Sequence, residues 1–450
     1  MGKLFGTDGV RGIANTELSC DIVFKLGQAG TYALTSAIKR PRILIGRDTR
    51  LSGEMLESAL VAGVCSVGGE AVVCGVLPTP AIAYLTRHYS MDAGIVISAS
   101  HNPVEYNGIK LFNTSGHKLA DAIEDYIEEV IEKGLDECGV KLPSGEGVGR
   151  RVRIKNASRE YVDFLCGTTE THLGGMKVVL DCANGAASNV AEDVFARLGA
   201  TIYPIYNNPD GKNINDNCGS TSPQRLQQLV TELGADVGLA FDGDADRLIA
   251  VDEHGMIVDG DKIMAICALD MKENNQLKNN TLVATIMSNL GLIKCMEKAG
   301  INVIQTQVGD RYVLERMIQD GCNLGGEQSG HIIFLDKNTT GDGILTGVHL
   351  LSVMAKKKTK LSVMSKQLKI YPQVLINARV PNSAKQKYQD DEVIQKRIKE
   401  IEELFEGNGR VVIRPSGTEP VIRVMIEAPD KQLIDKSAWE LAKLIESRLK

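Results

Sequence analysis

An acidic triplet is the sharpest chemical signal in the chain, in the segment Asp242-Gly-Asp-Ala-Asp246-Arg247. Alternate side chains of an extended loop can converge, and three carboxylates about 5 Å apart would repel by about 3 kcal/mol per pair at an effective dielectric constant of about 20. A cation relieves this repulsion, and all-oxygen ligation by Asp242, Asp244 and Asp246 suits Mg²⁺ or Ca²⁺. An EF-hand is disfavoured, although Glu253 occupies its twelfth position, because Arg247 stands where that loop needs glycine and residues 248–251 read as a strand. The other alternative is a solvated acidic turn.

A serine beside a histidine follows another apolar run, in Ser98-Ala-Ser100-His101-Asn102-Pro103. Ser100 could be a nucleophile, or merely the cap of a helix. The Asn-Pro pair favours a turn that exposes the side chains before it. Lys110 lies downstream and could donate or accept a proton near Ser100, although a lone lysine is more often a solvated surface charge.

A glycine-flanked loop carries groups suited to a sugar. Glycines precede Glu327-Gln-Ser329-Gly-His331 and allow a ligand to approach the backbone closely. A carboxylate and a hydroxyl together suit the hydroxyl groups of a sugar. The alternative is an ordinary loop that leads into a capped helix.

Two arginine-containing loops suit phosphate. The segment Arg414-Pro-Ser416-Gly417-Thr418-Glu-Pro, with Arg423 nearby, combines guanidinium groups, hydroxyls and loop amides that can cradle a phosphate dianion. A salt-bridged hairpin is the alternative. Near the start, Arg11 stands between glycines and could contact a phosphate or simply belong to a turn.

A repeated pattern predicts the scaffold that brings these loops together. Three stretches share one plan of apolar strand, helical segment and later strand, at residues 42–98, 177–240 and 281–325. Apolar strands that alternate with helical patterns predict βαβ units, hence an α/β fold with mixed, mostly parallel sheets. In each stretch a polar loop follows the later strand, where open α/β sheets bind ligands. We therefore expect three homologous α/β domains, each with one functional loop.

The C-terminal region has a different pattern. Two strands are expected at residues 410–414 and 421–427, with helices near 390–405 and 435–450, which predicts a smaller α+β domain. The expected domains are residues 1–153 with the Ser100 loop, 154–252 with the acidic loop, 253–369 with the sugar loop and 370–450 with the phosphate loop.

Composition excludes several classes of protein. The 450 residues include 51 basic and 57 acidic side chains, and the net charge of −6 argues against a general nucleic-acid or anionic-membrane binder. The ten cysteines form no Cys-x-x-Cys pair and are expected to be small buried residues in a reducing compartment. No apolar run reaches about 18 residues and no secretory signal opens the chain, so we expect a cytoplasmic protein.

Taken in their order, the motifs resemble those of the α-D-phosphohexomutase family from end to end of the chain. The resemblance implies four domains around a central cleft, a phosphoryl group on Ser100 in the resting enzyme, and Mg²⁺ bound by the three aspartates with an oxygen of the phosphoserine. It places the remaining site residues as follows: Arg11, His101, Lys110, Arg247 and His331 line the catalytic region; Glu327 and Ser329 read sugar hydroxyls; and Arg414, Ser416, Gly417 and Thr418 hold a second phosphate, with Arg423 as a helper.

The activity that this resemblance implies is that of an isomerase. A hexosamine phosphate, glucosamine 6-phosphate, would be converted to its 1-phosphate through a 1,6-bisphosphate, supplying amino-sugar nucleotide and cell-wall precursor synthesis. Lys110 is favoured as the general base, with His101 as the alternative. No nucleic-acid or membrane partner is expected, and a homodimer is compatible with the sequence. The alternatives are a phosphoglucomutase or phosphomannomutase of the same family, a non-catalytic sugar-phosphate sensor and a Mg²⁺ phosphatase.

Overall fold

The structure is a computed structural model that describes residues 4–6, 8–35, 38, 40–416 and 419–450. The chain divides into two compact units, Met1–Thr285 with Ile301–Lys366, and Ile286–Gly300 with Gln367–Lys450. Within the described ranges, no helix combines the length and apolar character that a membrane crossing requires.

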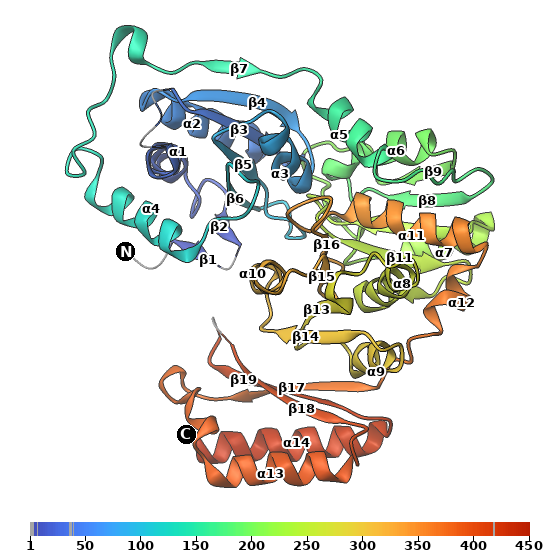
Figure 1. The fold of residues 1–450 in the computed structure, drawn as a ribbon. Coiled ribbons are helices and arrows are strands. Elements are labelled where there is room, and N and C mark those ends of the chain that lie inside the picture. The colour runs from blue at the N-terminus through green and yellow to red at the C-terminus, as the bar shows by residue number, and fades with distance from the viewer. Residues whose placement is uncertain (1–3, 7, 36–37, 39, 417–418) are drawn as a thin grey trace. The chain divides into compact units, whose positions relative to one another are not determined.

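Three sheets, which are coloured blue to orange in Figure 1, build the larger unit. The first contains β1 (Phe5–Gly6), β2 (Gly9–Ile13), β3 (Arg42–Arg47), β4 (Glu70–Val76), β5 (Ala93–Ile97), β6 (Tyr106–Asn113) and β7 (Arg151–Arg153). The second contains β8 (Lys177–Asp181), β9 (Thr201–Ile205), β10 (Val237–Phe241), β11 (Leu248–Asp252) and β12 (Ile257–Val258). The third contains β13 (Thr281–Thr285), β14 (Asn302–Thr306), β15 (Leu324–Gly326) and β16 (Ile332–Phe334).

The three sheets share one core order, as the repeated sequence pattern predicts. They contain the series β6-β5-β3-β4, β11-β10-β8-β9 and β16-β15-β13-β14. In each series the first pair is antiparallel and the other pairs are parallel. Each polar loop of the sequence connects the antiparallel pair: β5 to β6, β10 to β11, and β15 to β16. The fold therefore places all three loops at the carboxyl ends of equivalent strands.

Helices cover these sheets because the central strands are apolar on both faces. All five residues of β5, β10 and β13 are buried, as in sheets packed between helical layers. The helices of the first domain are α1 (Cys20–Thr35), α2 (Ser52–Ser66), α3 (Thr79–His88) and α4 (Asp121–Lys133). Those of the second are α5 (Ala157–Cys166), α6 (Ala191–Arg197) and α7 (Gln224–Leu233). Those that follow are α8 (Gly260–Glu273), α10 (Asp310–Asp320), α11 (Gly343–Lys357) and α12 (Leu361–Ser365).

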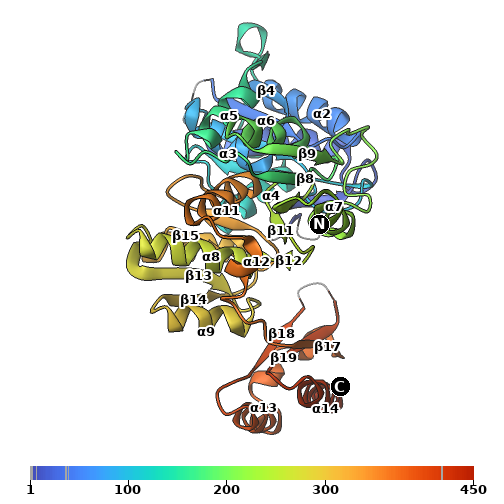
Figure 2. The ribbon, with the colours of Figure 1, turned by 90° about the vertical axis from the view of Figure 1, so that its right-hand side faces the viewer.

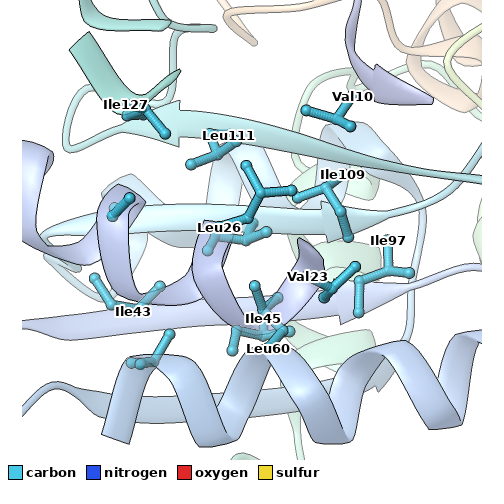
Figure 3. Packing of buried hydrophobic residues seen from close by; sticks show 14 of the residues in the cluster. Val10, Val23, Leu26, Ile43, Ile45, Leu60, Ile97, Ile109, Leu111 and Ile127 are labelled. Carbon is cyan, nitrogen blue, oxygen red and sulfur yellow. The ribbon is translucent and has the colours of Figure 1, made fainter. Parts of the chain in front are cut away.

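The core of the first domain lies between its sheet and three helices. Figure 3 shows Val23 and Leu26 of α1, Leu60 of α2 and Ile127 of α4 packed against β-strand residues such as Ile45. α1 and α2 approach closely because Gly63 faces the backbone of α1; a Cβ there would lie 2.2 Å from the Phe24 carbonyl oxygen. This packing fixes β5, and with it the start of the Ser100 loop.

The smaller unit contains the C-terminal domain and α9 (Leu290–Lys298). Its antiparallel sheet has the order β17 (Gln373–Arg379), β19 (Val421–Glu427) and β18 (Arg410–Pro415), with α13 (Glu392–Leu404) and α14 (Lys431–Arg448) on one face, as Figure 2 shows. The two predicted strands and two helices are present, and β17 is an additional strand that the sequence analysis missed. Glu427 is fully buried and accepts hydrogen bonds from Arg410 Nε at 2.6 Å and the Leu290 amide at 3.1 Å, which ties α9 to this sheet.

Candidate active site

Ser100 and the acidic loop meet in the larger unit. Although 142 residues separate them, Ser100 Oγ donates a hydrogen bond of 2.5 Å to Asp242 Oδ2. The structure thus brings together the two strongest chemical signals of the sequence. Both side chains are buried, with only 1% exposed.

The Ser100 loop is held in an unusual conformation by buried polar groups. Ser100 has φ 53°, a left-handed value that non-glycine residues rarely adopt outside functional or turn positions. Its amide donates to Ser98 Oγ at 3.0 Å, and its carbonyl accepts from Arg50 Nη2 at 3.0 Å and Asn215 Nδ2 at 2.9 Å. Arg50 is itself fully buried and paired with Asp48 at 2.9 Å. These contacts fix the backbone that carries the serine.

The three aspartates form a pocket of negative charge suited to a metal ion. One oxygen from each lies within 4.8 Å of the others, and all three residues are buried. Asp244 Oδ1 and Asp246 Oδ1 are buried without a hydrogen-bond partner among the described residues. Burial, together with Asp246 and Asp244, raises the pKa of Asp242 well above its ordinary value, because the free site opposes a further negative charge. A divalent cation would satisfy the unpartnered oxygens and remove the repulsion.

Lys110 is embedded in this negative charge. Its Nζ lies 2.8 Å from Asp244 Oδ2, 3.4 Å from Asp246 Oδ2 and 3.1 Å from Asp8 Oδ2, with 2% of the side chain exposed. Burial opposes its positive charge, but the neighbouring carboxylates prevail and raise the pKa of Lys110 well above its ordinary value. In this arrangement Lys110 is a firmly charged ammonium.

His101 is a neutral imidazole beside the serine. Its Nδ1 lies 3.3 Å from Ser100 Oγ. Burial, with Arg247 and Arg11 nearby, lowers the pKa of His101 to about 4. His101 can therefore accept a proton near neutral pH, which the charged Lys110 cannot do until it has released one.

Two guanidinium groups border the same site. Arg11 binds Asp8 and Arg247 Nε lies 3.8 Å from Asp246 Oδ1. The Nε atoms of both arginines are buried and make no hydrogen bond within the described part of the chain. Buried guanidinium donors without partners are suited to the oxygens of a bound phosphate.

The sugar loop approaches the acidic loop through the backbone. The amide of Leu248 donates to the Gly330 carbonyl at 3.0 Å, and His331 Nδ1 lies 3.6 Å from Asp246 Oδ2. Burial lowers the pKa of His331 but Asp246 and Asp310 outweigh this, so that the net shift is upward. Glu327 is half-buried and Ser329 is exposed, so these two side chains remain accessible to a ligand.

The predicted phosphate loop lies in the smaller unit. Arg414 of β18 and Arg423 of β19 are paired in register, and together with Met287 and Leu375 they line a cavity of about 30 Å³. Like charges directly opposite each other on a sheet are unfavourable unless an anion or carboxylate lies between them, and Arg423 pairs with Glu419 at 2.8 Å. Ser416 is buried and its Oγ accepts from the Glu419 amide at 3.1 Å. Gly417 and Thr418 lie outside the described residues.

Several residues that support the site were not predicted from the sequence. Asp48 and Arg50 follow directly after β3, so the rule that polar loops at strand ends are functional could have found them. Asp8 lies within the segment that contains Arg11, but no local pattern shows that its carboxylate contacts Arg11, Lys110 and Lys118 together.

Comparisons with known proteins identify the family. Four family models match the chain: Phosphoglucomutase/phosphomannomutase, alpha/beta/alpha domain I at residues 2–137, domain II at 159–255, domain III at 259–371, and the C-terminal domain at 375–444. The chain belongs to this family of phosphohexomutases. The predicted family, fold class and isomerase class are thereby confirmed.

Several curated relatives that match the whole chain share the name of one activity. Proteins named phosphoglucosamine mutase from Acetivibrio thermocellus and Clostridium novyi are 57% and 55% identical to this chain, over 100% of it and 100% and 99% of their own lengths. A protein of that name from Ruminiclostridium cellulolyticum is 57% identical over the full length of both chains.

Solved structures share the fold. A phosphoglucomutase/phosphomannomutase family protein from Burkholderia thailandensis has a TM-score of 0.82 at 24% identity, covering 99% of this chain and 97% of that one. The N-acetylphosphoglucosamine mutase of Aspergillus fumigatus, in complex with GlcNAc-6P and magnesium, has a TM-score of 0.72 at 17% identity, covering 99% and 96%.

Proposed function

We propose that the protein interconverts glucosamine 6-phosphate and glucosamine 1-phosphate through a phosphorylated Ser100. The observation that carries the proposal is the contact of Ser100 Oγ with Asp242 inside a buried acidic triplet. The choice of sugar is supported by relatives more than 50% identical over the whole chain that are named phosphoglucosamine mutase.

Mg²⁺ is the proposed cofactor, held by Asp242, Asp244, Asp246 and an oxygen on Ser100. The donor set is all oxygen, which suits this ion, and the magnesium in the complex of the Aspergillus protein supports the choice. The ion, when bound, would neutralise negative charge on the transferring phosphoryl group.

Two phosphoryl transfers complete the reaction. In the first, the Ser100 Oγ–phosphorus bond breaks as the free sugar hydroxyl bonds to phosphorus, and the hydroxyl proton passes to a base and then to Oγ. The 1,6-bisphosphate then turns over, and its other phosphorus bonds to Ser100 Oγ as the bond to the sugar oxygen breaks, with the serine proton passing to that sugar oxygen. Such a transfer depends mainly on in-line positioning and on charge stabilisation. Arg247 and Arg11, whose buried Nε groups make no hydrogen bond to the described residues, supply the stabilising positive charge.

Two residues of the site are candidates for the base: His101, which contacts the serine, and Lys110, which contacts the acidic triplet. His101 is neutral at pH 7 and lies 3.3 Å from Ser100 Oγ. Lys110 becomes a base only after it loses a proton, which the surrounding carboxylates oppose. The electrostatics of the described arrangement favour His101 over Lys110, the reverse of the expectation from the sequence.

The substrate itself is tested by turnover on three sugar phosphates. We expect the purified protein with Mg²⁺ to convert glucosamine 6-phosphate with a higher kcat/KM than glucose 6-phosphate or mannose 6-phosphate. A preference for glucose or mannose would reassign the chain to a phosphoglucomutase or phosphomannomutase activity. Release of inorganic phosphate without formation of a 1-phosphate would instead indicate a phosphatase.

Arg414→Ala should chiefly weaken substrate binding. We propose that Arg414, with Ser416, Gly417, Thr418 and Arg423, holds the phosphate that is not reacting. Loss of a charge-assisted hydrogen bond of about 1.5–3 kcal/mol predicts a KM about 10- to 100-fold higher with little change in kcat. Steady-state kinetics on glucosamine 6-phosphate measure this, with Arg379→Ala of the same sheet as the control. An equal loss of kcat at unchanged KM would contradict the binding role.

A further inference from the structure

A closed ring of charged and titratable side chains joins the first domain to the acidic loop, the sugar loop and the start of α10. Its members, in order of contact, are Lys110, Asp8, Lys118, Asp310, His331 and Asp246. Asp8 binds both lysines directly, and Lys118 also binds Asp310. His331 Nε2 lies 3.6 Å from Asp310 Oδ2, and Asp246 Oδ2 closes the ring 3.4 Å from Lys110 Nζ.

The ring is shielded from solvent, which distinguishes it from surface ion pairs. The side chains of Lys118 and Asp310 are 9% and 16% exposed, whereas Lys278 and Asp336, a pair elsewhere in the third domain, are 57% and 44% exposed. Exposed pairs contribute little because water and salt screen them, while removal of one partner of a shielded pair leaves an uncompensated charge. Loss of Asp310 should therefore disturb its neighbours more than loss of Asp336.

Lys118 and Asp310 contact the groups that surround the serine but neither Ser100 nor the acidic pocket itself. On one side, Lys118 binds Asp8, which also binds Arg11 and Lys110. This contact connects Lys118 to the cations of the first domain.

On the other side, Asp310 is the first residue of α10 and faces His331. The amide of the preceding Gly309 donates to Glu327 Oε1 at 3.1 Å. The start of α10 therefore contacts two polar side chains of the sugar loop, the buried His331 and the half-buried Glu327.

We infer that Lys118 and Asp310 are positioning residues for phosphoryl transfer. Their salt bridge fixes the start of α10 against Asp8. It thereby holds His331 and Glu327 at a fixed distance from Arg11 and Lys110, with the reacting phosphoryl group between the two pairs. This inference rests on the proposed function. Transfer is sensitive to such placement, because a displacement of about 1 Å can cost about 100-fold in rate.

Asp310→Asn tests the inference because it keeps the size of the side chain and removes its charge. We expect kcat for glucosamine 6-phosphate to fall about 10- to 100-fold while KM stays within about 3-fold. Lys118→Met should give the same pattern. Lys118→Arg, which keeps the positive charge, should retain most of the wild-type kcat. Circular dichroism and thermal melting establish that each variant is folded, and Asp310→Glu provides a charged variant should Asp310→Asn fail to fold.

Two control variants distinguish a positioning role of Lys118 and Asp310 from a purely structural role in holding the domains together. Asp336→Asn removes an aspartate from the exposed Lys278 pair and should leave kcat unchanged. Arg311→Met removes the contacts of the next residue with Asp121 and Glu124 of α4, and should lower the melting temperature more than kcat. A wild-type kcat for Asp310→Asn would overturn the inference. An equally large fall in kcat for Arg311→Met would also overturn it. A wild-type protein without mutase activity would instead refute the proposed function.

Discussion

Ser100→Ala should abolish mutase turnover. Removal of a nucleophile that carries the transferred group eliminates the covalent route, and comparable losses in other enzymes reach about 10⁴- to 10⁶-fold. The fold should survive, because alanine removes one hydroxyl whose hydrogen bond to Asp242 is worth about 1 kcal/mol, while Arg50 and Asn215 still hold the loop backbone. The measurement is the rate of glucosamine 1-phosphate formation, accompanied by circular dichroism.

Mass spectrometry makes the same variant a direct test of the phosphoserine. The wild-type protein should carry one phosphoryl group that maps to the peptide containing Ser100, and Ser100→Ala should not. Ser115→Ala, at an exposed serine of the same domain, is the matched control and should keep both the modification and the activity. Near-wild-type turnover by Ser100→Ala would rule out the covalent route, whatever the modification state.

The sequence predicted the parts of the site that lie in local polar loops after apolar strands. Ser100, Asp242 and Glu327 each follow β5, β10 or β15, and the equivalent strand orders of the three sheets place their loops at corresponding edges. The alternation of apolar strands and helical segments was enough to predict this arrangement. Each loop taken by itself had a simple structural alternative, so it was their shared position in the repeat that favoured chemistry.

The parts that escaped prediction depend on contacts between distant residues. Lys118 and Asp310 lie 192 residues apart, and each by itself is an unremarkable charged residue. The charge state of Lys110 escaped prediction for the same reason: it is set by Asp8, Asp244 and Asp246, which come from other segments. β17 was missed because its pattern, with exposed Leu375 on one face and buried Ala378 on the other, does not separate an apolar face from a polar one, and because it follows a proline.

Asp242→Asn should separate the metal-binding role of the acidic triplet from a structural one. In the metal-free protein burial and the neighbouring carboxylates raise the pKa of Asp242, which means that they oppose its negative charge, and asparagine removes that charge. The melting temperature of the metal-free variant should therefore equal or exceed that of metal-free wild type. Activity should fall about 10²- to 10⁴-fold, because several kcal/mol of charge stabilisation by the ion are lost.

Added Mg²⁺ should stabilise wild type more than the variant, which is the opposite of the order expected without metal. Wild type should gain about 2.7 kcal/mol of stability at 100 times its Kd, and the variant far less. Because the pKa of Asp242 is raised, protonation of this carboxyl competes with Mg²⁺, so the affinity of wild type should rise with pH more steeply than that of Asp242→Asn. Chelation should inactivate wild type and added Mg²⁺ should restore it. A structural triplet predicts the reverse pattern: Asp242→Asn would lower the melting temperature of the metal-free protein, and Mg²⁺ would stabilise neither form.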